Sequence, residues 1–398
     1  MKKSIKTFLK HPTKDSSNRS ANPAVIRAST ILFNTMQELY QHEKKIKKNK
    51  KVSYYSYGRY GSSTTIELEN ILKELEQAFH VFLTGTGFGG VALAIMSLCR
   101  PGDEIIVSDN VYGPTKEISE KLLKEFNVTA KFYNPDSFPD LKNKVTKKTK
   151  MILVENPGSN TFEFQDLSKI ISLAKKKKIF TFLDNTWGTP LYLKPLKLGF
   201  DMSFSSATKY FSGHSDAMGG SLAVNKKVFK QVMFFYKLSG YRMSADEAYL
   251  IIRGLRTLDT RLNQHYENTK QIINFLKKQK KVKEILYPYN PSSKNYKLWK
   301  KYYSGATGLL SIVIKSKKKS SVIKFVNSLE LFGIGYSWGG FESLAILQEL
   351  RSNKKDEYLQ GRKYFRFNKD EHIVRLHIGL EDPKDLINDL KRSLRYIK

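Results

Sequence analysis

Short apolar runs alternate with helical patterns through the middle of this 398-residue chain. The apolar runs lie at residues 105–107, 151–154, 179–183 and 200–204. Helical spacing is clearest between the second and third runs, at residues 167–178. Because this alternation implies helical crossovers between strands, it predicts an α/β fold with a largely parallel sheet. Such sheets bind ligands beyond the carboxyl ends of their strands, so polar residues at those ends mark a candidate site.

Two successive strand ends carry an acid and an amine. Asp184 closes one apolar run, and Lys209 follows the next. A lysine amine can condense with the aldehyde of pyridoxal phosphate, and a carboxylate can keep the pyridine nitrogen protonated so that the ring accepts electrons. Ser206 and Thr208, just before the lysine, can hydrogen-bond the cofactor phosphate. For either charged residue alone an ordinary surface position is the better interpretation, but four polar groups in one unit favour a pyridoxal phosphate site.

A glycine-rich segment, Thr84 to Gly90, follows the short strand at residues 81–83 and leads into an apolar helix. Glycines at such a junction let backbone N–H groups approach an anion at the helix N-terminus. Read from Gly85, the segment formally matches Gly-x-Gly-x-x-Gly, which by itself is a weak signal for a dinucleotide. Because no acidic ribose partner follows at the usual distance, a single phosphate is the preferred ligand.

Four further residues have types and positions that suit ligand binding. Tyr57 and Arg59 lie in a glycine-flanked loop, and an Arg side chain can donate two parallel hydrogen bonds to a phosphate. Tyr112 lies between a strand and a helix, where its ring could stack on a pyridine. Arg375 is a charge inside the apolar strand at residues 373–378, where a substrate carboxylate would offset the cost of burial. A surface turn, a core tyrosine and a structural ion pair are the respective alternatives.

The formal net charge of +32 is the one feature that favours a different class of protein. A basic surface of this strength can attract nucleic acid or an anionic membrane. The lysines, however, occur in short runs spread along the chain, which favours a solvated lysine-rich surface over nucleic-acid binding. No apolar run reaches the length of a membrane helix, and the single cysteine, Cys99, is typical of a reducing compartment. The prediction is a cytoplasmic protein that does not span a membrane.

Four motifs together resemble the cysteine and methionine metabolism family of pyridoxal phosphate enzymes. They are Asp184-Asn-Thr-Trp187, Ser206-Ala-Thr-Lys-Tyr210, Gly213-His-Ser-Asp216 and Ser337-Trp-Gly-Gly-Phe-Glu-Ser-Leu344, and they occur in the family's order. The resemblance implies the aminotransferase-like α/β fold (fold type I), with a large domain built on a mainly parallel sheet and a smaller C-terminal α/β domain. It also implies an N-terminal arm at residues 1–56, a cofactor-binding domain at residues 57–255 and a small domain at residues 256–398.

The resemblance assigns a role to each matching residue. Lys209 would bind the cofactor and carry the substrate α-proton, Asp184 would face the pyridine nitrogen, and Tyr112 would stack on the ring and could take part in proton transfer. The phosphate would be held by Gly87 and Phe88, through their backbone, and by Ser206 and Thr208, with Tyr57 and Arg59 reaching over from a neighbouring subunit. The substrate would be bound by Arg375, Ser337 and Trp338. No residue is assigned to a metal, and a site shared between subunits implies a homodimer that in this family assembles further into a tetramer.

Within the family the chain most resembles the β-lyase branch. Relatives that work at the γ-carbon usually carry other residues at the positions of Ser159, Trp187 and Trp338. The implied reaction is β-elimination of L-cystathionine to homocysteine, pyruvate and ammonia. Alternatives that use the same lysine are γ-elimination, γ-replacement and β-elimination from cysteine. One departure bears on the substrate, because Lys237 stands where the branch has a pocket tyrosine, and neither Tyr236 nor Tyr241 is assigned in its place.

The C-terminal third of the chain shows a second alternation of strand and helix patterns after a long helix near residues 255–280. Strands are expected at residues 308–314, 331–336 and 373–378, with helices at residues 320–329 and 384–397. This arrangement predicts a small α/β domain and places Ser337 and Trp338 at the end of its middle strand.

Overall fold

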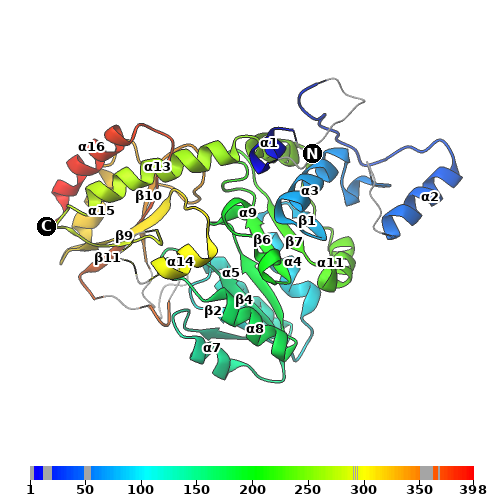
Figure 1. Cartoon of the computed structure of the whole chain (residues 1–398), viewed down its shortest axis with the longest axis horizontal. Helices are drawn as coiled ribbons and strands as arrows, with labels where there is room; N and C mark the ends of the chain where they lie inside the picture. The colour runs from blue at the N-terminus through cyan, green and yellow to red at the C-terminus, as the bar shows by residue number, and fades with distance from the viewer. Residues whose placement is uncertain are drawn as a thin grey trace.

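Two sheets organise the protein. The computed structural model describes residues 4–11, 20–48, 55–289, 291, 293, 295–349, 362–365 and 368–398. Seven strands form one sheet in the order β1-β7-β6-β5-β4-β2-β3, and four form the other in the order β10-β11-β9-β8. Figure 1 shows the smaller sheet and its helices beside the larger one, with α2 extending away on the opposite side. The predicted α/β architecture of a large and a small unit is confirmed.

The larger sheet is mainly parallel. Its strands are β1 (His80–Thr84), β2 (Glu104–Ser108), β3 (Thr129–Tyr133), β4 (Thr149–Glu155), β5 (Phe180–Asp184), β6 (Met202–Ser206) and β7 (Gly220–Val224). Pairing is parallel from β3 through β6, whereas β7 is antiparallel to both β6 and β1. The predicted parallel core is therefore confirmed, and β7 alone runs against the other six strands.

Helices cover both faces of this sheet because its strands are apolar on both faces. In β4, Met151 and Leu153 belong to one buried cluster with residues of α4 and α11, whereas Ile152 and Val154 belong to another with residues of α8. Side chains alternate between the faces of a strand, so both faces must be buried. The helical elements of this unit are α3 (Ser63–Glu76), α4 (Gly87–Leu98), α5 (Gly113–Glu117), a π-helical segment (Ile118–Leu122), α6 (Leu123–Glu125), α7 (Phe138–Lys144), α8 (Leu167–Lys177), α9 (Thr189–Tyr192), α10 (Pro195–Leu198), α11 (Lys226–Ser239) and α12 (Ala245–Leu255).

The smaller sheet is antiparallel throughout and lies beyond the long helix α13 (Leu258–Leu276). Its strands are β8 (Val282–Leu286), β9 (Leu309–Lys315), β10 (Leu344–Gln348) and β11 (Glu371–His377), and the helices that accompany them are α14 (Tyr296–Tyr302), α15 (Lys319–Asn327), α16 (Pro383–Ser393) and the 3-10 helix Leu394–Tyr396. We propose that the small domain begins at residue 256, between α12 and α13.

The strand predicted at residues 331–336 is wrong. This segment makes one isolated bridge, between Gly333 and Leu344, and the sheet position next to β11 belongs to β10. Ser337, which follows the segment, has a φ of 78°, a left-handed conformation that non-glycine residues adopt only when their surroundings impose it. Ser337 and Trp338 therefore lie in a loop, and not at the end of a strand.

Residues near the N-terminus divide into a docked and an extended part. Helix α1 (Ile5–Lys10) docks through Leu9, which is buried with apolar residues of α3 and α12, and through an ion pair between Lys10 and Asp259. Helix α2 (Met36–Lys47) extends away from the body (Figure 1). Among the residues that the structure describes, no helix is both long and apolar enough to cross a membrane.

Candidate active site

The structure brings Asp184 and Lys209 to one edge of the larger sheet. Strand β5 ends at Asp184, and its parallel neighbour β6 ends at Ser206, three residues before Lys209. The negative charge of Asp184 acts on the pKa of Lys209, so the acid and the amine share one environment. This is the arrangement that the strand ends predicted.

The Lys209 amine faces a serine from the small unit. Its Nζ donates a hydrogen bond to Ser337 Oγ at 2.7 Å and lies 5.6 Å from the centre of the Trp338 ring. Burial, aided by the positive charge of Arg375, lowers the pKa of Lys209 to about 8, although Asp184 opposes the shift. A much larger fraction of neutral amine is therefore present near neutral pH than for an ordinary lysine, as a nucleophile requires.

Asp184 is held by its own turn. One carboxylate oxygen accepts hydrogen bonds from the backbone N–H of Thr186 at 2.9 Å and from its hydroxyl at 2.6 Å. Burial nevertheless raises the pKa of Asp184 to about 6, against the effect of these hydrogen bonds and of Lys209. The hydrogen bonds and the nearby lysine thus do not fully offset the cost of burying the negative charge of Asp184. A cationic ring nitrogen beside the carboxylate would stabilise its charged form.

A second acid, Glu155, belongs to the same sheet edge and was not among the site residues predicted from the sequence. It is the last residue of β4 and pairs with Asp184, and its Oε2 accepts a hydrogen bond from the Tyr112 backbone N–H at 2.6 Å. Burial and the neighbouring Asp184 raise the pKa of Glu155 well above its usual value. The rule that identified Asp184, a polar residue closing an apolar strand, would also have found Glu155.

Tyr112 belongs to the same group of residues around Asp184 and Lys209 at the sheet edge, which we call the crevice. It precedes α5, and its side chain is 48% exposed, so the ring can contact a ligand. Burial of its hydroxyl raises the pKa of Tyr112, and the charges of Glu155, Arg375 and Asp184 also act on it. The phenol therefore remains protonated at neutral pH and is close to the acid and to the arginine.

The N-terminus of α4 forms a small cradle next to Ser206. Gly87 and Phe88 are the first two residues of this helix, where backbone N–H groups have no partner within the helix. A Cβ atom on Gly87 would lie 2.4 Å from Ser206 Oγ, so only glycine leaves this space open. Thr208 is held nearby, because its Oγ1 accepts a hydrogen bond from Gly219 N at 3.0 Å. Backbone donors, a hydroxyl and an open space together suit a phosphate group.

Arg375 is a largely buried cation on β11. Its Nη2 donates a hydrogen bond to the Ser337 carbonyl oxygen at 2.9 Å, and burial lowers the pKa of Arg375 to about 10. Within the part of the chain that the structure describes, no ion pair includes Arg375, which disfavours the alternative of a structural ion pair. Ser337 thus contacts both Lys209, through its hydroxyl, and Arg375, through its carbonyl.

Tyr57 and Arg59 are not brought to this crevice within one chain. They lie on and just before the 3-10 helix Gly58–Tyr60, and the Arg59 guanidinium lies 5.8 Å and 5.1 Å from the ring centres of Tyr57 and Tyr60. The Arg59 carbonyl accepts a hydrogen bond from Arg242 Nε. Both side chains are exposed, so they are free to contact another subunit.

The residues that suggested β-elimination lie in different surroundings. Trp187 is buried in the core, where its Nε1 donates to the Leu309 carbonyl at 3.2 Å, whereas Trp338 lies beside Lys209. Ser159 contacts the Tyr112 loop by donating its N–H to the Asn110 carbonyl at 2.8 Å. Tyr236 is also largely buried, and its hydroxyl donates a hydrogen bond to the Leu83 carbonyl at 2.7 Å.

Lys209 and Asp184 at neighbouring strand ends, close to an anion-binding helix N-terminus at Gly87, are typical of an α/β enzyme that uses pyridoxal phosphate. Residues 6–395 match the family described as Cys/Met metabolism PLP-dependent enzyme, so the chain belongs to that family and its cofactor is pyridoxal 5'-phosphate. The residues fit this cofactor, because the open cradle at Gly87, the under-compensated Asp184 and the low pKa of Lys209 suit its phosphate, ring nitrogen and aldehyde. Family and relatives together support a carbon–sulfur lyase.

Relatives of this chain carry several activities in their names. The cystathionine beta-lyase of Bordetella avium is 34% identical over 398 residues, which cover 98% of each chain. The L-alanine/L-glutamate racemase of Wolbachia pipientis is 33% identical over 381 residues, covering 94% of this chain and 92% of that protein. Among solved structures, cystathionine gamma synthase from Xanthomonas oryzae has a TM-score of 0.88 and 27% identity, with 100% of this chain and 99% of that one covered.

The low pKa of Lys209 predicts how the cofactor-free enzyme takes up pyridoxal phosphate. Only the neutral amine attacks an aldehyde, so the rate of covalent uptake should rise as the pH increases and reach its half-maximal value near pH 8. The appearance of the lysine-bound cofactor absorbance, measured from pH 6 to 10, tests this. Because Arg375 contributes to the low pKa of Lys209, Arg375→Met should move the midpoint of this pH dependence upward. Pyridoxine phosphate has no aldehyde, so the pH dependence of its binding should show no such rise near pH 8. A midpoint above pH 9.5 would contradict the proposed environment of the lysine.

Proposed function

We propose that this protein catalyses β-elimination of L-cystathionine, with water, to homocysteine, pyruvate and ammonia. The observation that carries the proposal is the pair of contacts from Ser337 to Lys209 and to Arg375. They bring a proton-carrying amine close to a cation that forms no ion pair with the residues that the structure describes. An α-amino acid needs this pair, because its carboxylate requires a cation while its α-proton requires a base. The similarity to a cystathionine beta-lyase supports the choice of substrate.

Each residue of the crevice has a proposed part in the reaction. When bound, pyridoxal phosphate supplies a ring that stabilises negative charge at the substrate α-carbon. Lys209 would hold the cofactor and would remove the substrate α-proton, while Asp184 would lie beside the ring nitrogen and favour its charged form. Arg375 binds the substrate carboxylate, and Ser337 and Trp338 fix the direction of the Cα–H bond. The leaving thiolate takes a proton from Lys209 or from Tyr112.

The remaining site residues are proposed to bind the phosphate and to join subunits. Gly87 and Phe88 would hold the phosphate through their backbone N–H groups, and Ser206 and Thr208 through their hydroxyls, with the Thr208 hydroxyl turning away from the Gly219 carbonyl to which it donates at 3.3 Å. Tyr57 and Arg59 serve the phosphate in a neighbouring subunit, because their exposed positions leave them free to cross an interface.

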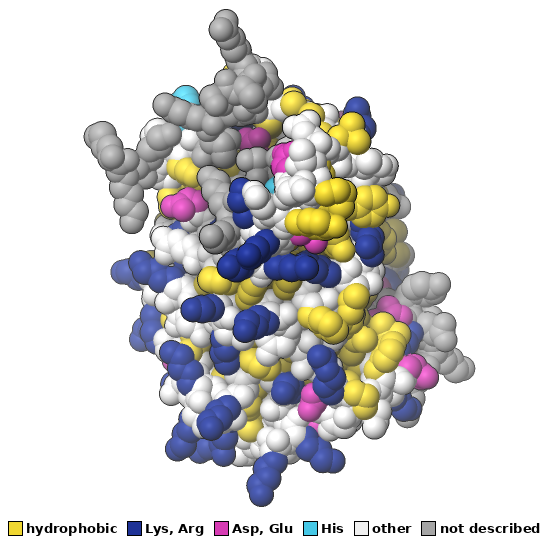
Figure 2. All heavy atoms as spheres, turned by 90° about the vertical axis from the view of Figure 1, so that its right-hand side faces the viewer, with side chains coloured by type: hydrophobic (Ala, Val, Ile, Leu, Met, Phe, Trp, Pro, Cys, Tyr) yellow, Lys and Arg dark blue, Asp and Glu magenta, His cyan; other side chains and the backbone are white. Residues whose placement is uncertain are grey.

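A homo-oligomer is proposed from the apolar side chains around the N-terminal arm. Leu32 and Tyr40 are 88% and 64% exposed, and Phe234 and Leu238 on α11 are 65% and 70% exposed. Figure 1 places α2 and α11 on the side of the molecule that Figure 2 faces, and apolar side chains are visible there. Large apolar side chains exposed together mark interaction surfaces. We propose dimers that share active sites and pair into tetramers.

The charged surface favours a soluble lysine-rich protein over a nucleic-acid-binding one. In Figure 2, Lys and Arg side chains are spread over much of the face and alternate with apolar and uncharged side chains. We propose that the enzyme acts in the cytoplasm on a small amino acid, with Cys99 buried as a free thiol.

Racemisation of an α-amino acid is the second candidate function. A relative named as a racemase matches nearly the whole chain, and Tyr112 gives the crevice a second proton carrier besides Lys209. Both reactions begin with removal of the α-proton, and they differ in whether a β-substituent leaves or a proton returns to the other side of the α-carbon.

Product analysis with the cofactor-loaded enzyme separates these functions. With L-cystathionine we expect pyruvate, homocysteine and ammonia in equal amounts. Cysteine and 2-oxobutyrate would instead assign the enzyme to γ-elimination and would contradict the proposal. In a parallel reaction with L-alanine, formation of D-alanine faster than cleavage of L-cystathionine would favour the racemase.

A further inference from the structure

A buried cluster of four charges lies beside the active site. Asp109 accepts hydrogen bonds from Lys116 Nζ at 2.9 Å and from Arg362 Nε at 3.3 Å, and Glu163 accepts one from Arg362 Nη2 at 2.8 Å. The side chains of Asp109, Glu163 and Arg362 are 0%, 4% and 4% exposed. Two acids and two bases make the cluster neutral, which is the condition for keeping charges out of water.

The cluster joins both units of the protein next to Tyr112. Asp109 lies in the loop between β2 and α5 that ends with Tyr112, and Glu163 lies between β4 and α8. Arg362 belongs to the small unit, and it precedes β11, the strand that carries Arg375. The backbone N–H of Tyr364 also donates to Asp109, at 3.0 Å, so two groups of the small unit bind one carboxylate of the large unit.

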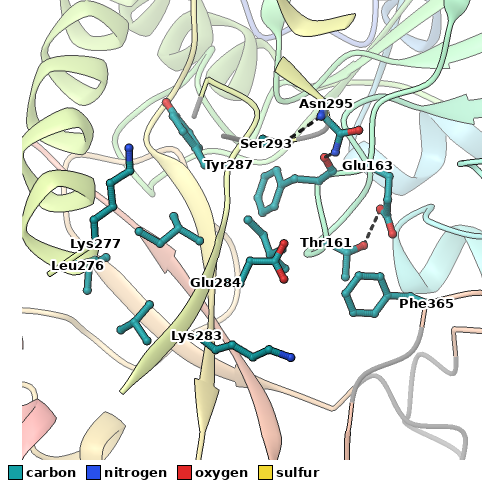
Figure 3. Close-up of a pocket in the computed structure, with 14 residues that line it drawn as sticks. Thr161, Glu163, Leu276, Lys277, Lys283, Glu284, Tyr287, Ser293, Asn295 and Phe365 are labelled. Carbon is teal, nitrogen blue, oxygen red and sulfur yellow. Dashed lines mark hydrogen bonds between the residues drawn. The ribbon is translucent and has the colours of Figure 1, made fainter. Parts of the chain in front are cut away.

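A cavity lies beside the cluster, between residues of the large and the small unit. The cavity has a volume of about 700 Å³. Figure 3 shows Thr161, Glu163 and Phe365 on one side of it and Glu284 of β8 on the other. Across this region the Asn295 side chain donates to the Phe162 carbonyl at 3.1 Å. Polar contacts join the two units here in addition to the apolar cluster that spans them, and those of Arg362 are ionic.

Arginine is suited to position 362 because its guanidinium donates hydrogen bonds in three directions. Nε binds Asp109, Nη2 binds Glu163 and Nη1 binds the Thr161 hydroxyl at 2.5 Å. Lysine has a single nitrogen and cannot reach all three acceptors with the same geometry. The side chain thus ties the residue at position 362 of the small unit to the β2–α5 loop and to the Thr161 to Glu163 segment of the large unit.

We propose that Arg362 is a positioning residue for the substrate: it sets the distance between Arg375 on β11 and the Tyr112 loop. The substrate lies between these two groups if the proposed function is right, so the inference rests on that function. Displacement of Arg375 by about 1 Å would weaken carboxylate binding strongly, because charge-assisted hydrogen bonds depend on distance and direction. A structural ion pair alone would affect folding and leave the Michaelis constant unchanged.

The test uses the holoenzyme and separates binding from folding. Arg362→Met leaves Glu163 buried and unpaired, so the informative variant is Arg362→Met combined with Glu163→Gln, which restores neutrality in the cluster. We expect this double variant to fold and to bind cofactor, with KM for L-cystathionine raised at least tenfold and kcat changed less than threefold. Arg362→Lys should give an intermediate KM, and the exposed Arg395→Met should behave like the wild type.

Binding of L-alanine, followed by the change in cofactor absorbance, is measured in parallel. Every α-amino acid presents the same carboxylate to Arg375, so its Kd tests Arg362 even if the wild-type enzyme does not cleave L-cystathionine. That failure would count against the proposed function alone. A double variant that is folded and cofactor-loaded, with KM and Kd within twofold of the wild type, would overturn the positioning role.

Discussion

Replacing Lys209 with alanine is expected to abolish turnover of L-cystathionine, with a loss of at least about 10³-fold in kcat. General acid–base groups contribute about 10²–10⁴-fold, and Lys209 is proposed to be the attachment point of the cofactor as well. No other amine is seen to replace it, since among the described residues Lys209 is the lysine that contacts both Ser337 and Trp338. Turnover is measured by pyruvate formation after saturation with pyridoxal phosphate.

The control for Lys209→Ala is a lysine of the same sheet that lies outside the crevice. Lys131 on β3 forms an ion pair with Glu104 at 2.8 Å, and Lys131→Ala should retain wild-type activity. The Lys209 variant should still bind the cofactor noncovalently, through the phosphate site at Gly87. We therefore expect its affinity for inorganic phosphate to be unchanged while its turnover of L-cystathionine is lost. A variant that keeps more than a tenth of the wild-type rate would require another lysine to carry the reaction.

Residues at strand ends could be predicted because the signal for them is local. Asp184 and Lys209 each follow an apolar run, and parallel strands bring their carboxyl ends to one edge whatever the rest of the chain does. The phosphate cradle is local in the same way, since Gly87 lies at the start of the helix that the glycine-rich segment predicted. To predict these parts of the site, one needs to know only the direction of each strand and which strands lie next to it.

Contacts between the two units could not be predicted, because they depend on residues far apart in the chain. Lys209 and Ser337 are separated by 128 positions, and the conformation of Ser337 contradicts the strand that its neighbours' composition suggested. Arg362 gave no periodic signal, because its partners Asp109 and Glu163 lie on loops of the other unit. The antiparallel direction of β7 could not be predicted for a related reason, since pairing on both sides of a strand is decided by tertiary contacts.

Replacing Arg375 with methionine is expected to lower kcat/KM for L-cystathionine by about 10–100-fold, mainly through KM. A hydrogen bond to a charged group contributes about 1.5–3 kcal/mol, and each 1.4 kcal/mol is a factor of ten. Steady-state kinetics on the cofactor-loaded variant measure the change. An amine substrate analogue without a carboxylate should bind the variant and the wild type equally, which makes it the matched control ligand.

Loss of folding is not the expected cause of such an effect, because burial of the Arg375 charge costs stability in the ligand-free protein and offsets its hydrogen bond to the Ser337 carbonyl. Its folded-state pKa of about 10 lies below the ordinary value of 12.5, so at any pH below 10 the charged form costs up to about 3 kcal/mol of stability. Methionine of similar length removes that charge, and replacing buried charges with apolar residues is often neutral or stabilising. The ligand-free variant should therefore melt at the same temperature as the wild type or higher, while a substrate-like carboxylate should raise the melting temperature of the wild type alone. An unchanged kcat/KM in a folded variant would show that the carboxylate binds elsewhere.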